Sequence, residues 1–373
     1  MNQPVPFTNR PPLSAATRKV AIACCAPFGT GGLGRHLQEV VEYYQPQVST
    51  EYFCLRPLSR DPHGHSISLA GLRLLQRWSP LRFYREWQIY FENRLFDRAV
   101  ASRQIETDLL ICFNGQALTT FRHARASARI LAAANSHFNL TARKMRQAFH
   151  DHPIEPIGYL RGMHQRFLAE YELASGIYYS SNYTRESFVQ EGISPGKLTR
   201  FDLTPASRFV PPNRREKEDI FRVVYVGSLS VTKGVQVLIR AFQSFQTSPA
   251  ELLLIGGSGT RQMNRFLQQA VRSDPRIQIR PGDPLPCLQQ ADVCVHPSYN
   301  DGLAYAGLEA LACGVPVIAS GDTGMKELIR PGINGWIVPT GDSAAILEKL
   351  IEVHQHPLAA TYPLLPSRCA SSS

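Results

Sequence analysis

The sequence predicts a parallel α/β protein made of two separately wound domains. The first observation is length, because 373 residues suffice for two domains that each bury a core of their own. The second is composition, since 43% hydrophobic and 19% charged residues exclude a mainly disordered chain. The third is order: short apolar runs alternate with stretches of helical periodicity, which is typical of parallel sheets covered by helices.

The first half of the chain follows this alternation. Residues 1–17 are rich in proline, serine and threonine and are expected to form a flexible tail. Five apolar runs then predict strands, and two stretches of helical period predict helices between them. The predicted strands are Lys19–Cys25, Thr50–Leu55, Asp108–Phe113, Arg129–Ala134 and Ile177–Ser180, and the predicted helices are Leu33–Tyr44 and Phe83–Arg103.

A charged, proline-rich stretch, Asp202–Asp219, separates the two halves and indicates a linker. We therefore expect an N-terminal domain over residues 18–204 and a C-terminal domain over residues 205–373. A second alternation follows, and it ends in a Gly-rich turn and a hairpin-like strand within Val293–Asp342. The other predicted strands are Phe221–Val226, Glu251–Ile255, Ile277–Arg280, Asp292–His296 and Val315–Ala319, and the predicted helices are Gly234–Phe245, Thr260–Val271, Tyr305–Cys313 and Ser343–Val353.

Charge is distributed unevenly along the chain. The 40 Lys and Arg residues outnumber the 30 Asp and Glu residues, which gives a formal net charge of +10. Residues 51–150 hold 15 basic and 7 acidic side chains (+8), whereas residues 201–373 hold 16 and 15 (+1). Such a field suits an anionic membrane surface, a phosphorylated substrate or a nucleic acid. Nucleic acid is not expected as a partner, because no recognition motif accompanies the charge.

Compartment and membrane contact follow from other features. No apolar run reaches the ~18 residues of a spanning helix. The eight cysteines lie mostly in apolar runs without a C-x-x-C or His/Cys cluster, which indicates buried free thiols and no metal site. Arg73–Arg98 interleaves aromatic residues with arginines, as in a core-packed helix with a basic face or in peripheral membrane contact. A cytoplasmic protein is predicted, and peripheral contact with the inner face of the membrane is the open alternative.

A glycine-rich loop, Gly29-Thr30-Gly31-Gly32-Leu33-Gly34, follows the first predicted strand and is a literal G-x-G-x-x-G. One interpretation is a dinucleotide fingerprint, with Arg56 accepting the 2′-phosphate of NADP. Three residues separate the strand from the first glycine, which weakens that match. A second interpretation is a purely structural strand-to-helix turn. The favoured one is a loop whose N–H groups, at a helix start, face the phosphate of another ligand.

The most informative stretch is Val293–Asp342, which holds two acids eight residues apart. Asp301 precedes a predicted helix, and Glu309 lies within it among leucines and alanines. A carboxylate there is costly to bury unless it accepts strong hydrogen bonds, such as those of a ribose diol. Gly302 lets a ligand approach the backbone, and the helix start offers N–H groups to phosphate or sugar oxygens. Alternatively, Asp301 caps the helix and Glu309 pairs with an arginine.

The run PSYNDGLAYAGLEALACGVPVIAS, followed by TGMKELI and NGWIV, resembles the donor site of the retaining group 1 (family 4) glycosyltransferases. The resemblance implies the GT-B fold, in which two Rossmann-like domains face a central cleft. In the family's E-x7-E pattern the second acid binds the nucleotide ribose, and Glu309 takes its place. The first acid contacts the donor sugar, and here it is Asp301, which is shorter by one methylene. No resident cofactor or metal is implied.

Other segments support the resemblance between about residues 20 and 345. VVYVGSLSVTKGVQVLIRAF resembles the strand, loop and helix in which a basic pair clamps the diphosphate; Lys233 matches the lysine, and Ser228 stands where many members have arginine. GGSGT resembles the next glycine turn, and GGLGRHLQEV the loop that touches the donor phosphate. ANSHFNLTARKM resembles the segment whose histidine, here His137, lines the reaction centre.

The resemblance also implies which residues form the site. The implied catalytic residues are His137, Asp301 and Lys233. The implied donor contacts are Gly31, Gly32, Ser228, Lys233, Gly257, Asp301, Gly302, Leu303, Ala304 and Glu309.

Simpler interpretations of two of these residues remain open. Lys233 could be an exposed lysine at a helix start, although its charge would oppose the helix dipole there. His137 could be a turn residue with satisfied hydrogen bonds.

The resemblance implies transfer of a sugar from a nucleotide-diphosphate donor to a glycan or lipid-linked acceptor. The C-terminal domain would bind the donor and the N-terminal domain the acceptor. An NADP-dependent oxidoreductase built on the glycine loop is the alternative. A third hypothesis is a truncated, inactive relative, because family members end in a helix that crosses back to the first domain. The last residues here, HPLAATYPLLPSRCASSS, lack an amphipathic period.

Overall fold

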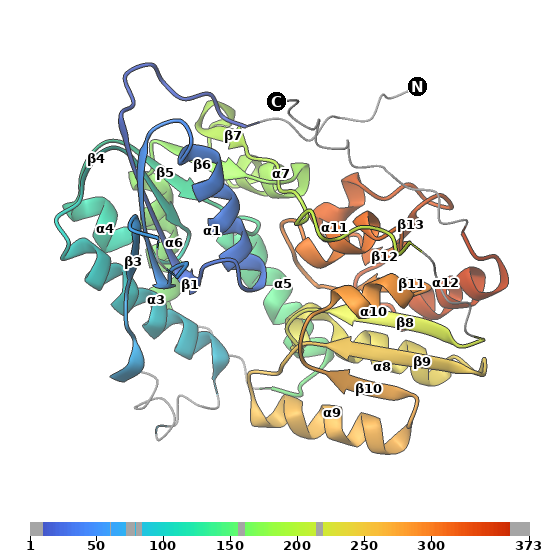
Figure 1. Ribbon diagram of the computed structural model, residues 1–373. Helices are drawn as coiled ribbons and strands as arrows, with labels where there is room; N and C mark the ends of the chain where they lie inside the picture. The colour runs from blue at the N-terminus through green and yellow to red at the C-terminus, as the bar shows by residue number, and fades with distance from the viewer. Residues whose placement is uncertain are drawn as a thin grey trace. The chain divides into compact units, whose positions relative to one another are not determined.

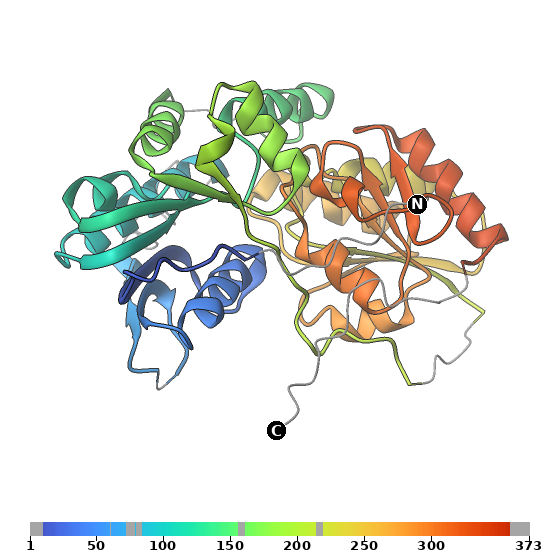
Figure 2. The same ribbon diagram turned by 90° about the horizontal axis from the view of Figure 1, so that it is seen from above.

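The computed structural model forms two compact units. In each, a parallel sheet carries helices on its two faces (Figures 1 and 2). Apart from the gaps given in the next sentence, the N-terminal unit comprises residues 10–143 and 161–203, and the C-terminal unit comprises residues 144–155 and 204–358. The residues that the structure describes are 10–59, 61–71, 79, 84–155, 161–213 and 219–358.

The N-terminal unit is built on a seven-stranded sheet in the order β3-β2-β1-β4-β5-β6-β7, with every neighbouring pair parallel. Its strands are β1 (Lys19–Pro27), β2 (Ser49–Arg56), β3 (Gly64–Ser66), β4 (Glu106–Phe113), β5 (Arg125–Ala132), β6 (Gly176–Tyr179) and β7 (Leu198–Arg200). Its described helices are α1 (Gly31–Tyr44), α3 (Arg85–Ala101), α4 (Leu118–His123), α6 (Arg161–Leu173), α7 (Asn182–Gln190), the 3-10 turn η2 (Pro195–Lys197) and the first six residues of α5 (Phe138–Asp151), whose remaining residues belong to the C-terminal unit.

The first strand and helix show how the sequence builds this unit. The strand β1 is buried along most of its length because both faces of a parallel sheet are covered, so it forms a continuous apolar run. In α1 the buried residues Leu37, Val40, Val41 and Tyr44 recur with helical period and face the sheet. A Cβ at Gly34 would lie 2.0 Å from a carbonyl oxygen of β1, so only glycine lets the helix start this close to the strand.

Part of the predicted flexible tail is fixed to this unit. Residues 1–9 lie outside the described residues. Arg10 forms an ion pair with Glu39 of α1 at 2.9 Å, and its guanidinium lies 4.3 Å from the ring centroid of Phe201. Tyr43 donates a hydrogen bond to the carbonyl of Pro11 at 2.7 Å. The composition of the stretch indicated a loose tail because it carries no periodicity, but these contacts hold residues 10 and 11 in place.

The C-terminal unit is built on a six-stranded sheet in the order β10-β9-β8-β11-β12-β13, again parallel throughout. Its strands are β8 (Phe221–Val226), β9 (Ala250–Ile255), β10 (Ile277–Arg280), β11 (Val293–His296), β12 (Val317–Ser320) and β13 (Gly335–Val338). Its helices are α8 (Val235–Ser244), α9 (Arg261–Ser273), α10 (Leu285–Gln290), α11 (Tyr305–Ala312), α12 (Ser343–Gln355) and the 3-10 turns η3 (Val231–Lys233) and η4 (Gly324–Glu327).

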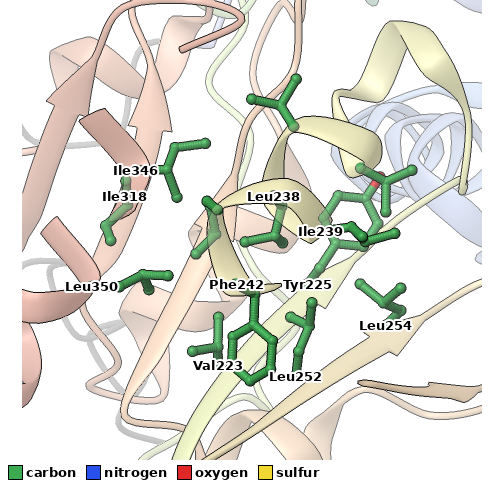
Figure 3. Close-up of a cluster of buried hydrophobic side chains, with 14 of the residues drawn as sticks. Val223, Tyr225, Leu238, Ile239, Phe242, Leu252, Leu254, Ile318, Ile346 and Leu350 are labelled. Carbon is green, nitrogen blue, oxygen red and sulfur yellow. The ribbon is translucent and has the colours of Figure 1, made fainter. Parts of the chain in front are cut away.

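The core of the C-terminal unit lies where α8 packs on the sheet. Figure 3 shows Leu238 and Phe242 of α8 in one cluster with Val223 of β8 and Leu252 of β9. Leu350 of α12 belongs to the same cluster. All five side chains are fully buried, and burial of such side chains contributes about 1.5–3 kcal/mol each. This packing fixes the start of α8, and therefore the turn before it, against the carboxyl ends of β8 and β9.

The last strand differs from the sequence prediction. The hairpin expected at the end of Val293–Asp342 is wrong, because β13 pairs parallel to β12, with Val317 opposite Gly335. A hairpin joins antiparallel strands through a short turn, whereas parallel neighbours need a crossover of about a dozen residues or more. Residues 321–334 supply that crossover and include η4.

The boundary between the units falls between Leu203 and Thr204. Most of the stretch indicated as a linker packs on the C-terminal unit: Arg208 forms an ion pair with Asp283 at 2.5 Å, and Phe209 is 3% exposed. Residues 144–155 also belong to the C-terminal unit, which the sequence pattern did not indicate. The physical cause is long-range packing, because this segment is distant in the sequence from the unit that it joins.

Some sequence predictions lie partly outside the described residues. Residues 73–78 and 80–83 of the predicted amphipathic stretch, residues 214–218 of the linker and residues 359–373 are among these. Within the described ranges, all seven cysteines are free. No helix in the described part of the chain combines the length and the apolar character needed to span a bilayer.

Candidate functional site

The strand order of the C-terminal unit creates a switch point between β8 and β11. From β8 the chain proceeds to β9 and β10 on one side and then to β11, β12 and β13 on the other. At such a point the loops that follow the two central strands diverge, and ligands of doubly wound sheets bind at these carboxyl ends. Lys233 follows β8 and Asp301 follows β11. The topology therefore brings two predicted site residues to one edge of the sheet.

Lys233 is presented by a tight turn. It is the last residue of η3, and Gly234 follows with a φ of 70° before α8 begins. A Cβ at Gly234 would lie 2.0 Å from the carbonyl oxygen of Pro297, so only glycine lets the turn approach the loop after β11. The backbone N–H of Tyr299 also donates to the carbonyl of Thr232 at 3.0 Å. Backbone contacts alone therefore hold the turn of Lys233 against the loop after β11.

Lys233, Asp301 and His296 form a charged cluster. Lys233 Nζ lies 2.5 Å from Asp301 Oδ2, and His296 Nε2 lies 3.3 Å from the same oxygen. Burial alone would raise the pKa of Asp301, but the charge of Lys233 and the neighbouring His296 imidazole outweigh it and hold that pKa well below its usual range. Asp301 is therefore a carboxylate at any physiological pH. His296 carries no sequence signal of its own, because its role depends on where β11 ends.

Some polar atoms of the cluster have no hydrogen-bond partner among the described residues and are available to a ligand. In the described part of the chain, Asp301 Oδ2 is the only hydrogen-bond acceptor of Lys233 Nζ, and the Lys233 side chain is 30% exposed. An ammonium has three donors, so two N–H groups remain. Asp301 Oδ1 makes no hydrogen bond with the described residues. One carboxylate oxygen thus holds the ammonium of Lys233, and the other can accept from a ligand hydroxyl.

Glu309 and Asp301 lie on either side of the start of α11. Glu309 is in the body of the helix and is 1% exposed. Ala304 is the N-cap residue, so Asp301 does not cap the helix, which excludes one alternative from the sequence. Gly302, Leu303 and Ala304 connect the acid to the helix and are buried. The backbone N–H of Asp301 donates to the carbonyl of Asp322 at 3.3 Å, which ties this loop to the one after β12.

Ser228 and Gly257 occupy neighbouring loops after β8 and β9. The N–H of Leu229 donates to the carbonyl of Gly257 at 3.0 Å and joins the loops. Ser228 Oγ is buried and has no hydrogen-bond partner among the described residues. A Cβ at Gly257 would meet no atom within 4 Å, so space lies beside that residue. Both positions therefore offer room or a hydrogen bond to a ligand of the C-terminal unit.

Gly31 and Gly32 belong to the N-terminal unit. They are the first two residues of α1, and both are exposed. The N-cap residue Thr30 makes no side-chain capping hydrogen bond, and the first turn holds no acidic residue. The loop follows β1 at the switch point of its own sheet, between β1 and β4. An exposed helix start without a cap is the arrangement that suits an anion.

His137 also belongs to the N-terminal unit and is 2% exposed. Its ring lies 4.6 Å from that of Tyr171 and 5.2 Å from that of Phe188, and its Nδ1 accepts from the N–H of Asn139 at 3.2 Å. Burial lowers the pKa of His137 to about 4. The imidazole is therefore neutral at pH 7, so His137 can act there through a hydrogen bond but not through a positive charge.

The lowered pKa of His137 predicts a pH-dependent stability. Between about pH 4 and 6.5 the unfolded chain binds more protons at this residue than the folded chain. His137 therefore reduces stability as pH falls through that window, by at most about 1.4 kcal/mol per pH unit. Thermal unfolding between pH 4.5 and 7.5 should show a shallower pH dependence for His137→Gln. Replacing the exposed His123 by glutamine is the control and should leave the slope unchanged. Equal slopes for all three proteins would contradict the prediction.

The predicted residues thus fall into two groups. The C-terminal unit brings Lys233 into contact with Asp301 and places Ser228, Gly257 and Glu309 on loops or helices at the carboxyl ends of the same sheet. His137 and the two glycines of α1 are in the other unit. Within the described ranges, no group of three or more His, Cys, Asp or Glu side chains could hold a metal ion.

Comparison with known proteins agrees with this geometry. The family described as "Glycosyl transferases group 1" matches residues 220–356, which hold the whole cluster. The D-inositol 3-phosphate glycosyltransferase of Salinispora arenicola is 32% identical over 188 residues, covering 44% of this chain and 41% of that protein. The chain therefore aligns with less than half the length of this curated relative.

Solved structures match almost the whole chain. Sucrose-phosphate synthase from Thermosynechococcus elongatus aligns with a TM-score of 0.69 at 18% identity, covering 91% of this chain and 90% of that one. Anabaena HepE, solved in complex with UDP-glucose, aligns with a TM-score of 0.63 at 16% identity, covering 90% of each chain. Residues 220–356 therefore match the group 1 glycosyltransferases, and the chain has the α/β, two-domain GT-B fold.

Proposed function

We propose that this chain is a retaining glycosyltransferase that transfers a sugar from a nucleotide-diphosphate donor to an acceptor hydroxyl in the synthesis of a polysaccharide, glycolipid or cell-envelope glycan. The observation that carries the proposal is the Lys233–Asp301 pair at the switch point, in the segment that matches the group 1 family. The buried Glu309 lies in the same segment. A cation with spare donors beside a carboxylate with a free oxygen suits a ligand that is both phosphorylated and hydroxylated.

The reaction breaks the bond between the sugar's anomeric carbon and the diphosphate oxygen, and the electron pair leaves with the diphosphate. The acceptor hydroxyl forms the new bond on the same face, and its proton passes to an oxygen of the departing diphosphate. Two charges must be stabilised: the growing negative charge on the diphosphate and the positive, oxocarbenium-like centre on the sugar. At the switch point, Lys233 carries a positive charge that suits the diphosphate, and Asp301 carries a negative charge that suits the oxocarbenium-like centre.

We assign the roles as follows. Lys233 donates its two remaining N–H groups to the departing diphosphate, and the hydroxyl of Ser228 adds a neutral donor where many family members have an arginine. Asp301 holds Lys233 through Oδ2 and accepts a sugar hydroxyl through Oδ1. Glu309 accepts the ribose hydroxyls. Backbone N–H groups near Gly257, Gly302, Leu303 and Ala304, and those of Gly31 and Gly32, complete the donor contacts, and His137 contacts the reacting sugar. No metal is required, because Lys233 supplies the positive charge.

The nature of the donor and the acceptor is also part of this proposal. Anabaena HepE was solved with UDP-glucose, which supports a uridine nucleotide sugar as the first donor to test. The positive charge of residues 51–150 supports an anionic or membrane-borne acceptor. An NADP-dependent oxidoreductase is not favoured, because the matched family and the aligned structures are those of glycosyltransferases.

The proposal is tested by screening nucleotide sugars for binding with native mass spectrometry, with NADPH as the competing ligand. Binding of at least one nucleotide sugar and none of NADPH is expected. Donor hydrolysis should persist in EDTA, and the released sugar should keep the donor's anomeric configuration in an NMR spectrum taken at early times. Binding of NADPH alone would overturn the proposal, and an inverted product would overturn the retaining mechanism.

A further inference from the structure

Residues 144–155, here named the docked segment, lie in the N-terminal half of the sequence but belong to the C-terminal unit. The segment consists of the last eight residues of α5 and the four that follow. Ala148 and Phe149 are 0% and 5% exposed and are members of the hydrophobic core of the C-terminal unit. The docked segment is therefore an integral part of the unit that holds the candidate donor site.

Glu155, the last residue of the docked segment, is 8% exposed, and its carboxylate bonds to two loops. Oε2 accepts from the backbone N–H of Val231 at 3.3 Å, and Oε1 accepts from the hydroxyl of Thr260. Val231 begins η3, whose own N-cap residue makes no side-chain capping hydrogen bond. Thr260 is the N-cap residue of α9. One carboxylate thus binds the starts of two helical elements, where a negative charge is favoured.

These two loops are the ones that would contact the diphosphate. They follow β8 and β9, which are adjacent and parallel. The first loop carries Ser228 and Lys233, and the second carries Gly257. A buried carboxylate is costly unless strong hydrogen bonds satisfy it, so the position of Glu155 is tightly coupled to the positions of its two partners. Since Val231 and Lys233 share one three-residue turn, fixing the first limits the movement of the second.

The docked segment also holds the loops around Asp301. Lys144 Nζ forms an ion pair with Asp322 Oδ2 at 2.6 Å, and the carbonyl of Asp322 accepts from the N–H of Asp301. The hydroxyl of Tyr299 donates to Asp151 Oδ2 at 3.3 Å. The loops after β8, β9, β11 and β12 therefore each make a polar contact with the docked segment.

We propose that Glu155 is a positioning residue for the donor site. Its hydrogen bonds to Val231 and Thr260 fix the turn that carries Lys233 relative to the loop that carries Gly257. The ammonium of Lys233 is thereby held where it can contact the donor diphosphate. Glu155 acts through Lys233 and takes no part in bond making. The inference rests on the proposed function, because it assigns the diphosphate as the group that Lys233 binds.

The first test is calorimetric titration of the full chain with UDP, GDP and ADP, followed by titration of variants with the nucleotide that binds most tightly. Glu155→Ala is expected to weaken that affinity about tenfold, since two hydrogen bonds to a charged group are lost. Glu155→Gln should retain most of the affinity, because its amide can still accept from Val231 and donate to the hydroxyl of Thr260. Glu155→Asp keeps the charge but is one methylene shorter, so it should weaken binding.

The matched control is Asp274→Asn. Asp274 is a similarly buried acid, 9% exposed, in the same unit, but it precedes β10 and so lies at the amino ends of the strands. Its hydrogen bonds to Arg276 contribute to stability, so this variant should have a lower melting temperature and unchanged nucleotide affinity. A purely structural role of Glu155 would produce the same pattern in Glu155→Ala and Glu155→Asp, and that result would overturn the inference.

A double-mutant cycle with Lys233→Ala tests whether Glu155 affects nucleotide affinity through Lys233. If Glu155 acts through Lys233, Glu155→Ala should weaken affinity about tenfold in the unaltered chain and less than twofold when Lys233 is already alanine. Equal losses in the two backgrounds would overturn the inference while the proposed function stands. Absence of binding of all three nucleotides and of every nucleotide sugar to the unaltered chain would instead overturn the proposed function itself.

Discussion

Replacing Glu309 by alanine is expected to abolish donor binding. Glu309 is 1% exposed within α11, and in the proposed site its carboxylate accepts the two hydroxyl groups of the nucleotide ribose. Hydrogen bonds to a charged group contribute about 1.5–3 kcal/mol each, so losing both weakens binding by about 100-fold or more. Calorimetric titration with a nucleoside diphosphate measures this loss directly.

Two further variants separate binding from folding. Glu309→Gln keeps the shape of the side chain and loses its charge, so affinity should fall by about tenfold while the melting temperature changes little. Glu251→Gln is the control, because Glu251 is a half-buried acid of β9 paired with Arg222. It should bind nucleotide as the unaltered chain does. Unchanged affinity in Glu309→Ala would show that the donor site has been wrongly assigned.

The second large effect is expected for Lys233→Ala, which should lower turnover at least tenfold, or about 1.4 kcal/mol in transition-state stabilisation. A lysine about 4 Å from a phosphate charge gains roughly 4 kcal/mol at an effective dielectric constant of 20, before the cost of desolvation. In the proposed clamp Ser228 takes the place where many family members have arginine, so Lys233 is the one cation expected there. Steady-state donor hydrolysis or transfer kinetics would measure the loss.

Lys349→Ala is the matched control for this prediction. Lys349 lies on α12 in the same unit, is 24% exposed and forms ion pairs with Glu348 at 2.8 Å and Glu352 at 2.9 Å. It therefore resembles Lys233 in burial and pairing but lies outside the switch point. Turnover should be unchanged in Lys349→Ala and substantially restored in Lys233→Arg, which keeps the charge. Full activity of Lys233→Ala would contradict the role of Lys233 in the clamp.

Local sequence signals were sufficient for most of the strands, whereas α4, α5, α6, α7 and α10 were not predicted. The strand Phe221–Val226 and the strand Ile277–Arg280 were predicted with the bounds that the structure shows. Apolar runs and helical periods depend on residues a few positions apart, so they can be recognised without knowing the tertiary structure. The strands β3 and β7 gave no such signal, because three residues are too few to establish a period.

The parallel pairing of β13 shows where local signals fail. A glycine-rich turn before a short apolar run is compatible with a hairpin, and that was the prediction. Whether the chain forms a hairpin or a crossover depends on which edge of the sheet is free to pair. Here the free edge was that of β12, and β13 pairs with it in parallel orientation. The partner of a strand is a property of the whole sheet.

The sequence alone determined the α/β class and the chemical types at the site, because the glycine turns, Lys233, Asp301 and Glu309 each lie in a short recognisable motif. Only the tertiary structure decided which of them meet. The Lys233–Asp301 pair spans 68 residues, His296 joins it only where β11 ends, and Glu155 reaches Val231 across 76 residues. Such contacts are formed by strand order and core packing, which no local pattern encodes, so the charged cluster and the docked segment became visible only in the folded chain.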